Sequence, residues 1–166
     1  MVRLRPMTEA EFEGWRPESL EGYAQERARN LGAPLEEQWV EAERQYAELL
    51  KDGVYTNGHW LWMVTLDTGE VVGNLWVRIA GDGTSAFIFG IDIDEAQRGK
   101  GYGKQTLDAL EAELKSLGVT RIGLNVFSDN VVATHLYQKQ GYRTTNSNFK
   151  PVLRPPLHEM VHWETW

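Results

Sequence analysis

The sequence predicts an α/β fold, in which a mixed β-sheet of about seven strands carries helices on both faces. Hydrophobic residues recur with helical spacing in the first third of the chain and with strand spacing after residue 58. Between residues 86 and 126 a strand, a helix and a second strand follow one another, which predicts a parallel, right-handed β-α-β unit. A chain of 166 residues is the length of one ordinary domain, so we expect a single domain over residues 1–166.

The first third of the chain predicts one short strand and two helices. VRLRPM, residues 2–7, alternates apolar with basic residues before it meets proline, which favours a strand. Thr8 and Glu11 have the spacing of a capping box and therefore predict a helix start. A second helix is indicated by apolar residues on one face and ends near Asp52; these residues are Leu35, Trp39, Ala42, Tyr46, Leu49 and Leu50.

The rest of the chain predicts six more strands and two helices. Residues 59–66 and 70–79 form a predicted hairpin, followed by a strand over 85–94 in which Gly90 marks a bulge or a close approach to the backbone. A helix runs from Gly103 to a C-terminal cap at Gly118. The predicted order continues with a strand at 120–127, a short helix at 131–140, strands at 142–149 and 160–166, and a proline-rich surface loop at 150–159 between these last two.

Composition narrows the class of protein. The formal net charge of −7 argues against nonspecific nucleic-acid binding and against an anionic membrane surface as a partner. No apolar run approaches the roughly 20 residues of a membrane span, so we expect a soluble, cytoplasmic protein. The absence of cysteine excludes disulfides and thiolate metal ligands, and we expect no metal site.

A cationic glycine-rich segment is the strongest candidate for a binding site. In DEAQRGKGYGKQT, residues 94–106, glycines at alternate positions let backbone N–H groups converge, and the following helix adds the positive end of its dipole. Such a bend binds phosphate. The spacing does not fit a P-loop, because only three residues separate Gly99 from Gly103-Lys104 where a P-loop has four. It does not fit a dinucleotide fingerprint either, because Thr106 stands where a third glycine would follow Gly101 and Gly103. A flexible turn without a ligand is the alternative.

Two motifs carry a resemblance to a known family. Residues 98–103 read as R-x-x-G-x-G after the strand FIFGIDID, and residues 130–142 read as N-x-x-A-x-x-L-Y-x-x-x-G-Y. Together they resemble the Gcn5-related N-acetyltransferase (GNAT) family, most closely over residues 87–143. The resemblance implies a GNAT-like acyl-CoA N-acyltransferase fold, acetyl-CoA as cosubstrate and direct transfer of its acetyl group to a primary amine.

The resemblance also implies the residues of the site. Acetyl-CoA would lie where strands 4 and 5 splay apart, with its pantetheine arm along the backbone of Ile91 and Ile93 and beside Asn130. Its pyrophosphate would meet the amides of the glycine bend, and Tyr137 would protonate the departing thiolate. The bend residues are Gly99, Gly101, Tyr102, Gly103 and Lys104, with Arg98 and Lys100 as steering cations. The structural alternatives are core isoleucines, a helix cap at Asn130 and a packing tyrosine at Tyr137.

The general base and the acceptor are less defined. Phe87 and Phe89 occupy the strand positions where certain relatives carry Glu or His, and alternation turns Asp92 to the other face unless a bulge reverses it. His158 and Glu159 are further candidates, each also explained as an ordinary surface residue, and a water relay is an equal alternative.

Two sets of residues point to different acceptors. The predicted helices are acidic and aromatic, as would suit a cationic amine, although a solvated acidic face over core aromatics explains the same pattern; the aromatics are Trp15, Tyr23, Trp39 and Tyr46. Lys150 and Arg154 favour an anionic group instead. A small-molecule amine is the first hypothesis and a peptide N-terminus or lysine the second. A non-catalytic acyl-CoA sensor is a third, and the resemblance alone implies a homodimer.

Overall fold

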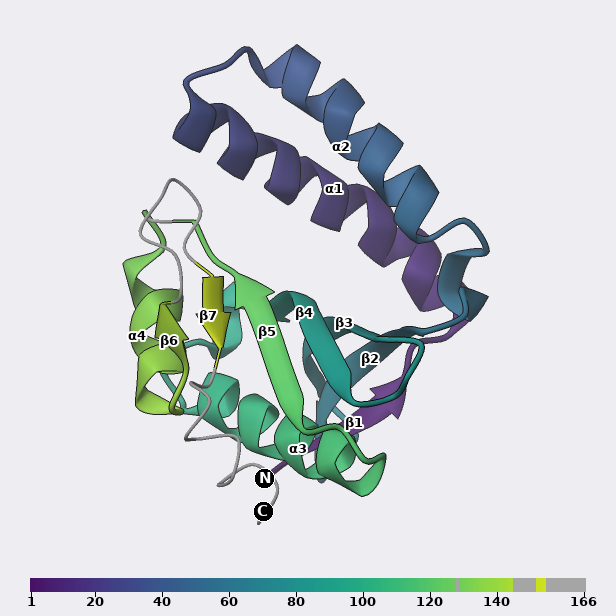
Figure 1. Cartoon of the computed structure of the whole chain (residues 1–166), viewed down its shortest axis with the longest axis vertical. Coiled ribbons are helices and arrows are strands. Elements are labelled where there is room, and N and C mark those ends of the chain that lie inside the picture. The colour runs from purple at the N-terminus through teal and green to yellow at the C-terminus, as the bar shows by residue number, and fades with distance from the viewer. Residues whose placement is uncertain (128, 145–151, 155–166) are drawn as a thin grey trace. The chain divides into compact units, whose positions relative to one another are not determined.

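The computed structural model describes residues 1–127, 129–144 and 152–154 (Figure 1). The chain divides into two compact units, one of which is Met7–His59, and the other Met1–Pro6 together with Trp60–Trp166. The single domain expected over residues 1–166 stays a prediction.

The first unit is a helical hairpin. It consists of α1 (Glu9–Leu31), α2 (Leu35–Leu49) and a single 3-10 turn, η1 (Gly53–Tyr55). The predicted capping box is confirmed, because the Glu11 amide donates to Thr8 Oγ1 at 3.2 Å and the Thr8 amide donates to Glu11 Oε1 at 3.0 Å. Both predicted helices therefore form, with boundaries within a few residues of those expected.

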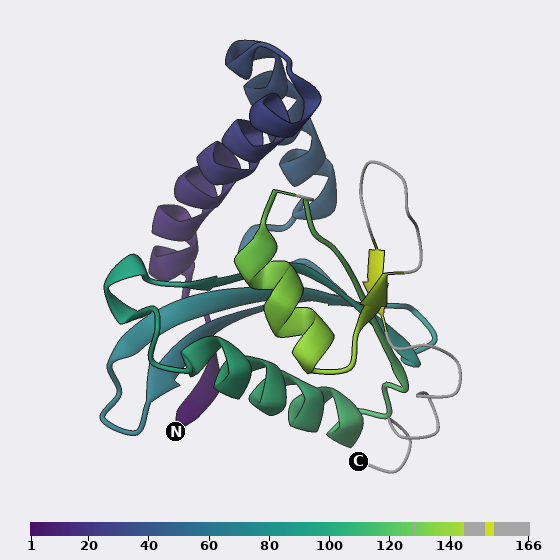
Figure 2. The ribbon, with the colours of Figure 1, turned by 90° about the vertical axis from the view of Figure 1, so that its left-hand side faces the viewer.

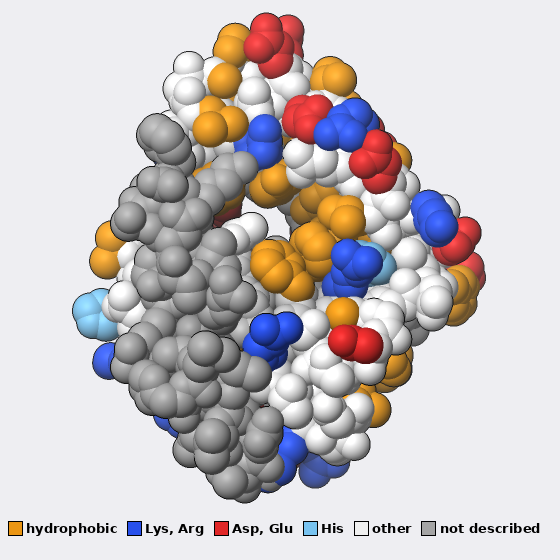
Figure 3. Space-filling model, viewed as in Figure 1, with side chains coloured by type: hydrophobic (Ala, Val, Ile, Leu, Met, Phe, Trp, Pro, Cys, Tyr) orange, Lys and Arg blue, Asp and Glu red, His pale blue; other side chains and the backbone are white. Residues whose placement is uncertain are grey.

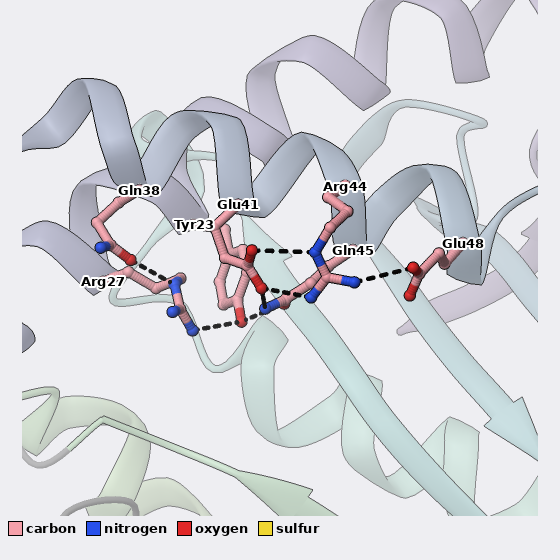
Figure 4. Close-up of polar contacts among 7 residues, drawn as sticks. All are labelled: Tyr23, Arg27, Gln38, Glu41, Arg44, Gln45 and Glu48. Carbon is pink, nitrogen blue, oxygen red and sulfur yellow. Dashed lines mark hydrogen bonds and ion pairs between the residues drawn. The ribbon is translucent and has the colours of Figure 1, made fainter.

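Aromatic and polar contacts hold the two helices of the hairpin together. Trp15 stacks on Tyr46, both buried, and Arg16 binds both carboxylate oxygens of Glu43 at 3.0 and 2.9 Å. Figure 4 shows two further polar contacts between the helices, in which Tyr23 donates to Gln45 and Arg27 donates to Gln38, and one set within α2, in which Arg44 bridges Glu41 and Glu48. Much of the acidity and aromaticity of these helices is thus engaged within the hairpin, which supports the structural explanation of that pattern.

The second unit is built on a mixed sheet with the order β1-β2-β3-β4-β5-β7-β6. Neighbouring strands are antiparallel at β1–β2, β3–β4, β5–β7 and β6–β7. The pair β4–β5 is parallel, which confirms the parallel pairing predicted for the β-α-β unit. The bounds are β1 Val2–Pro6, β2 His59–Leu66, β3 Val71–Ile79, β4 Ser85–Ile93, β5 Arg121–Asn125, β6 Arg143–Thr144 and β7 Val152–Arg154.

One prediction for the C-terminal region is wrong. Residues 150–159 were expected to form a surface loop, but Val152–Arg154 form β7, which pairs with both β5 and β6. The prolines on both sides favour a loop, yet they leave three consecutive residues with amides available for pairing. The strand expected at 160–166, and the end of the one expected at 142–149, lie outside the described residues.

Two helices, α3 (Tyr102–Ser116) and α4 (Val131–Lys139), pack on the hydrophobic core of this unit. Figure 2 shows α3 lying along one face of the sheet. Its Leu107, Leu110 and Leu114 are fully buried against strand residues that include Ile88 and Leu124. The helix ends in a Schellman motif, because the amides of Gly118 and Val119 donate to the carbonyls of Lys115 and Leu114. This core fixes β4 and β5, between which the candidate site lies.

Candidate functional site

The site begins where β4 and β5 part. Their parallel pairing ends at Ile88 and Leu124, whereas β4 continues to Ile93. The amide of Asp94 donates to the carbonyl of Val72 on β3 at 2.8 Å. Because backbone groups alternate between the two edges of a strand, those of Ile91 and Ile93 are directed to the edge that β5 has left. The described strands therefore leave the β4 edge at Ile91 and Ile93 without β5 pairing, and the binding of a cofactor along this edge stays a prediction.

A β-bulge precedes this opening. Trp76 lies opposite Gly90 while Val77 lies opposite Ile88, so Phe89 is the extra residue of β4. The bulge predicted from Gly90 is thus observed at the adjoining residue. Its consequence is a change of face: Asp92 pairs with Asn74 and Phe87 pairs with Arg78, which are alternate residues of one strand. Asp92 therefore shares a face with Phe87, which simple alternation would have denied it.

Glycine is favoured at the three positions of the bend for different structural reasons. Gly99 and Gly101 adopt φ values of 79° and 83°, in the left-handed region that residues with a Cβ avoid. Gly103 is helical, and a Cβ on it would lie 3.2 Å from Cδ2 of Leu136. This close approach brings α4 against the first turn of α3, so the two sequence motifs meet at this point.

The amino end of α3 presents backbone donors. The amide of Gln105 donates to the carbonyl of Gly101 at 3.2 Å, and the N-cap Gly101 supplies no side-chain cap. The amides of Tyr102, Gly103 and Lys104 precede that bond and thus have no acceptor within the helix. Together with the helix dipole they form a place that favours an anion.

The cations of the bend are exposed, and each contacts a neighbour. Arg98 donates to the carbonyl of Ile93 at 2.8 Å and to Asp92 Oδ1 at 3.2 Å. Lys100 donates to the side chain of Gln97, and Lys104 pairs with Asp108 at 2.9 Å. Exposed pairs of this kind contribute about 0–1 kcal/mol, so a multiply charged anion can compete for these cations.

The two α4 residues of the predicted site have defined structural roles. Asn130 Oδ1 accepts the Ala133 amide at 3.1 Å, so the helix-cap explanation of this residue is confirmed. Tyr137 is 5% exposed and belongs to the core, with its ring edge-on to that of Tyr142 at 5.8 Å between centroids. Tyr137 is therefore more deeply buried than the half-buried packing position expected from the sequence, and its role towards a cofactor stays a prediction.

The buried carboxyl group of Glu111 contacts Tyr142, the second of these tyrosines. The Tyr142 hydroxyl donates to Glu111 Oε1 at 3.4 Å. Burial, followed by the nearby charge of Asp108, raises the pKa of Glu111 to about 8. Burial also raises the pKa of Tyr142 well above its ordinary value. Sequence reasoning missed Glu111, because one acidic residue in a helix gives no sign of its burial.

The sheet face opposite the core contains a cavity of about 300 Å³. Phe87 and Gly123, which pair across β4 and β5, lie in its lining together with Arg78, Ser85, Gly81 and Arg121. An aromatic row leads from it towards the bulge, since Phe87 contacts Phe89 edge-on at 5.0 Å and Phe89 stacks on Trp76 at 4.6 Å. Figure 3 shows basic side chains near hydrophobic ones over the region of the strands. The sequence analysis did not identify Arg78 or Arg121.

Several predicted residues are not brought to the site by the described structure. Lys150, His158 and Glu159 lie outside the described residues, and Arg154 belongs to β7. Among the residues that are described, no group of three or more histidines or carboxylates could hold a metal ion. Within the same part of the chain no helix is long and apolar enough to cross a membrane.

Comparisons with known proteins agree with this geometry. Residues 17–142 match the family described as the acetyltransferase (GNAT) family. The uncharacterized N-acetyltransferase YdgE of Bacillus subtilis is 34% identical over 152 residues, which cover 90% of this chain and 97% of that protein. The crystal structure of the putative acetyltransferase YycN of B. subtilis superposes with a TM-score of 0.86 at 31% identity, covering 89% of this chain and 96% of that one.

A more distant structure shares the fold. The PaiA N-acetyltransferase of Thermoplasma acidophilum, solved in complex with coenzyme A, has a TM-score of 0.70 at 18% identity and covers 93% of this chain and 98% of that one.

Proposed function

The chain belongs to the acetyltransferase (GNAT) family and is an N-acetyltransferase, and from this premise we propose that it transfers the acetyl group of acetyl-CoA to a primary amine on a small molecule. The carrying observation is that pairing with β5 ends at Ile88 while β4 continues to Ile93, the residue that leads into the glycine bend. A wedge next to an anion-binding bend suits a ligand that has an extended arm and a diphosphate.

The cofactor would be bound mainly through backbone groups. Its diphosphate meets the amides of the bend and of the first turn of α3, and Arg98, Lys100 and Lys104 exchange their present partners for phosphate oxygens. The pantetheine amides pair with Ile91 and Ile93 as a missing strand would. Asn130 keeps its cap through Oδ1 and offers its Nδ2 to the pantetheine arm. The coenzyme A complex of the T. acidophilum relative supports this choice of ligand.

The reaction requires an oxyanion donor and a proton for the thiolate. A neutral amine attacks the thioester carbon, the C–N bond forms, and the N–H of Ile91 stabilises the oxyanion. The C–S bond then breaks, and the electron pair leaves with sulfur. The hydroxyl of Tyr137 gives its proton to the departing thiolate late in this step, and the proton that the nitrogen loses as the amide forms passes through water and restores the hydroxyl.

The amine must lose a proton before it attacks. Phe87 and Phe89 cannot accept it, and Asp92 shares their face but pairs with Arg98. We therefore propose that water carries this proton to solvent. The small cavity beside Phe87 favours a small-molecule acceptor over a peptide N-terminus or lysine.

Two measurements test the proposal. Calorimetric titration with acetyl-CoA should show binding, and thiol release with a panel of primary amines should show turnover. Tyr137→Phe should lower kcat roughly 10²-fold or more with an unchanged Kd for acetyl-CoA. Tyr142→Phe is the matched control, because it also removes a buried hydroxyl from the core but should leave kcat near that of the unmodified protein.

The outcomes separate the alternatives. Binding of acetyl-CoA without turnover by any amine would favour the sensor, and efficient turnover of peptides alone would favour the second acceptor class. Equal kcat in Tyr137→Phe and the unmodified protein would remove the proposed role of that hydroxyl. Absence of acetyl-CoA binding would refute the cofactor assignment.

A further inference from the structure

We infer that the acceptor amine carries an anionic oxygen group, a carboxylate or a phosphate, which Arg78 and Arg121 bind on the sheet face opposite the core. The inference rests on the proposed function, since it assigns the substrate class of the same site. Three observations support it: an acceptor can approach the wedge from the cavity side, the described lining of the cavity is positively charged, and the cavity lies within reach of the wedge.

Among the described residues of this unit, the hydrophobic core fills one face of the wedge and a cavity lies on the other. On one side of β4 and β5 the side chains of Ile88 and Leu124 are buried against α3 and α4. The other side carries Phe87 and Gly123, which line the 300 Å³ cavity. An amine that approaches a thioester held between these strands must therefore come from the cavity side.

The charge of the cavity is positive over its described lining. Arg78 and Arg121 are exposed residues on β3 and β5, and no acidic side chain belongs to the lining among the described residues. Within the described part of the chain neither guanidinium forms an ion pair. Arg121 interacts electrostatically with the carboxylate of Asp82. The pKa of Asp82 is lowered mainly by its hydrogen bond with Thr84 and to a smaller extent by the charge of Arg121. Two guanidinium groups that line one cavity with Phe87 match an oxyanion, because each can donate two parallel hydrogen bonds.

The cavity lies within reach of the reacting carbon. Phe87 immediately precedes Ile88, the last β4 residue paired with β5, and Ile91 is three residues further along the strand. At roughly 3.3 Å per residue, the cavity floor and the oxyanion donor are about 10–13 Å apart along β4. An acceptor of amino-acid size spans part of this distance and the arginine side chains span the rest. The cavity volume also lies at the small end of the range for ligand sites, about 300–1,000 Å³.

Matched pairs of acceptors test the charge requirement. Thiol release is measured with α- and ω-amino acids against their carboxamides, and with phosphoethanolamine against ethanolamine. We expect kcat/KM to favour the anionic member of at least one pair roughly 10- to 100-fold. The carboxylate and phosphate arms distinguish the two oxyanions.

Variants assign the preference to the two arginines. Arg78→Gln and Arg121→Gln should each reduce the anionic preference about tenfold, mainly through KM, with an unchanged Kd for acetyl-CoA. Lys115→Gln is the control: it removes the same charge from the exposed end of α3 and should leave the preference intact. Equal rates for charged and neutral members, or an equal loss for both in the two variants, would overturn the inference.

A binding assay separates this inference from the proposed function. If acetyl transfer is absent, amino acids and phosphoethanolamine are titrated calorimetrically into the protein. Binding that weakens in Arg78→Gln and Arg121→Gln but persists in Lys115→Gln would support the anion site without acetyl transfer. Absence of binding by either oxyanion class, in a protein that also fails to transfer acetyl groups, would refute it.

Discussion

The buried carboxyl of Glu111 makes a specific prediction about stability and pH. Its pKa rises from 4.5 in its ordinary environment to about 8 in the folded protein, first through burial and then through the charge of Asp108. Lys104 and the Tyr142 hydroxyl, which also face this carboxyl, act in the opposite direction without cancelling the rise. Between pH 4.5 and about 8 the folded state therefore retains a proton that the unfolded chain releases, and the free energy of unfolding falls as the pH rises.

The magnitude follows from this interval. Each pKa unit corresponds to about 1.4 kcal/mol, so the interval sets an upper bound of about 5 kcal/mol. Because part of the carboxyl remains hydrated, solvent screening reduces this value, and we expect a loss on the order of 2 kcal/mol. The contribution is fully present below pH 4.5 and is lost by about pH 8.

Glu111→Gln removes the titration while keeping the size of the side chain and its contact with Tyr142. Urea unfolding at pH 5 and pH 8.5 should show that the variant gains on the order of 2 kcal/mol relative to the unmodified protein between the two conditions. Glu113→Gln, an exposed position on the same helix, should run parallel to the unmodified protein. Other titrating groups are common to all three proteins and cancel in the difference. Parallel pH profiles for Glu111→Gln and the unmodified protein would refute the reasoning.

Three further substitutions test the local structure. Thr8→Ala removes the Oγ1 acceptor of the Glu11 amide and should cost about 1 kcal/mol in urea unfolding; an unchanged free energy of unfolding would contradict a stabilising cap. Gly118→Ala places a Cβ at a φ of 87° and should cost roughly 1–2 kcal/mol; an unchanged midpoint would contradict the Schellman cap. Gly103→Ala creates a 3.2 Å contact with Leu136 at the first turn of α3, so calorimetry should show weaker acetyl-CoA binding, whereas Gly81→Ala, with open space around the new Cβ, should not.

The helical elements were predictable because their signals are local. The capping box at Thr8 and the glycine after α3 each specify a boundary within a few residues. The glycine bend was predictable for the same reason, since alternate glycines and the following helix lie in one continuous segment. The strand β7 was not, because its pairing with β5 and β6 depends on residues far away in the sequence, while its flanking prolines favour a loop.

The cavity and the buried carboxyl could not be read from the sequence for a related reason. Arg78 and Arg121 are more than 40 positions apart, and only the pairing of β3, β4 and β5 brings them to one cavity. Glu111 lies among alternating polar and apolar helix residues, and its burial depends on Tyr142, which follows α4. A sequence pattern shows which residues are neighbours within one helix or strand. The cavity and the buried carboxyl depend instead on contacts between residues of different helices and strands.

The bulge at Phe89 connects the fold to the chemistry. Without the extra residue, β4 would place Phe87, Phe89 and Ile91 on one face, and Asp92 would point into the core with α3. With it, Ile91 packs against the core while Asp92 reaches the opposite face and binds Arg98 at the glycine bend. The bulge at Phe89 also directly follows Ile88, the last β4 residue that pairs with β5, and bulges bend a strand and increase its local twist. One inserted residue therefore accounts for the orientation of Ile91 and for the position of the Asp92 carboxylate that binds Arg98, the first cation of the bend.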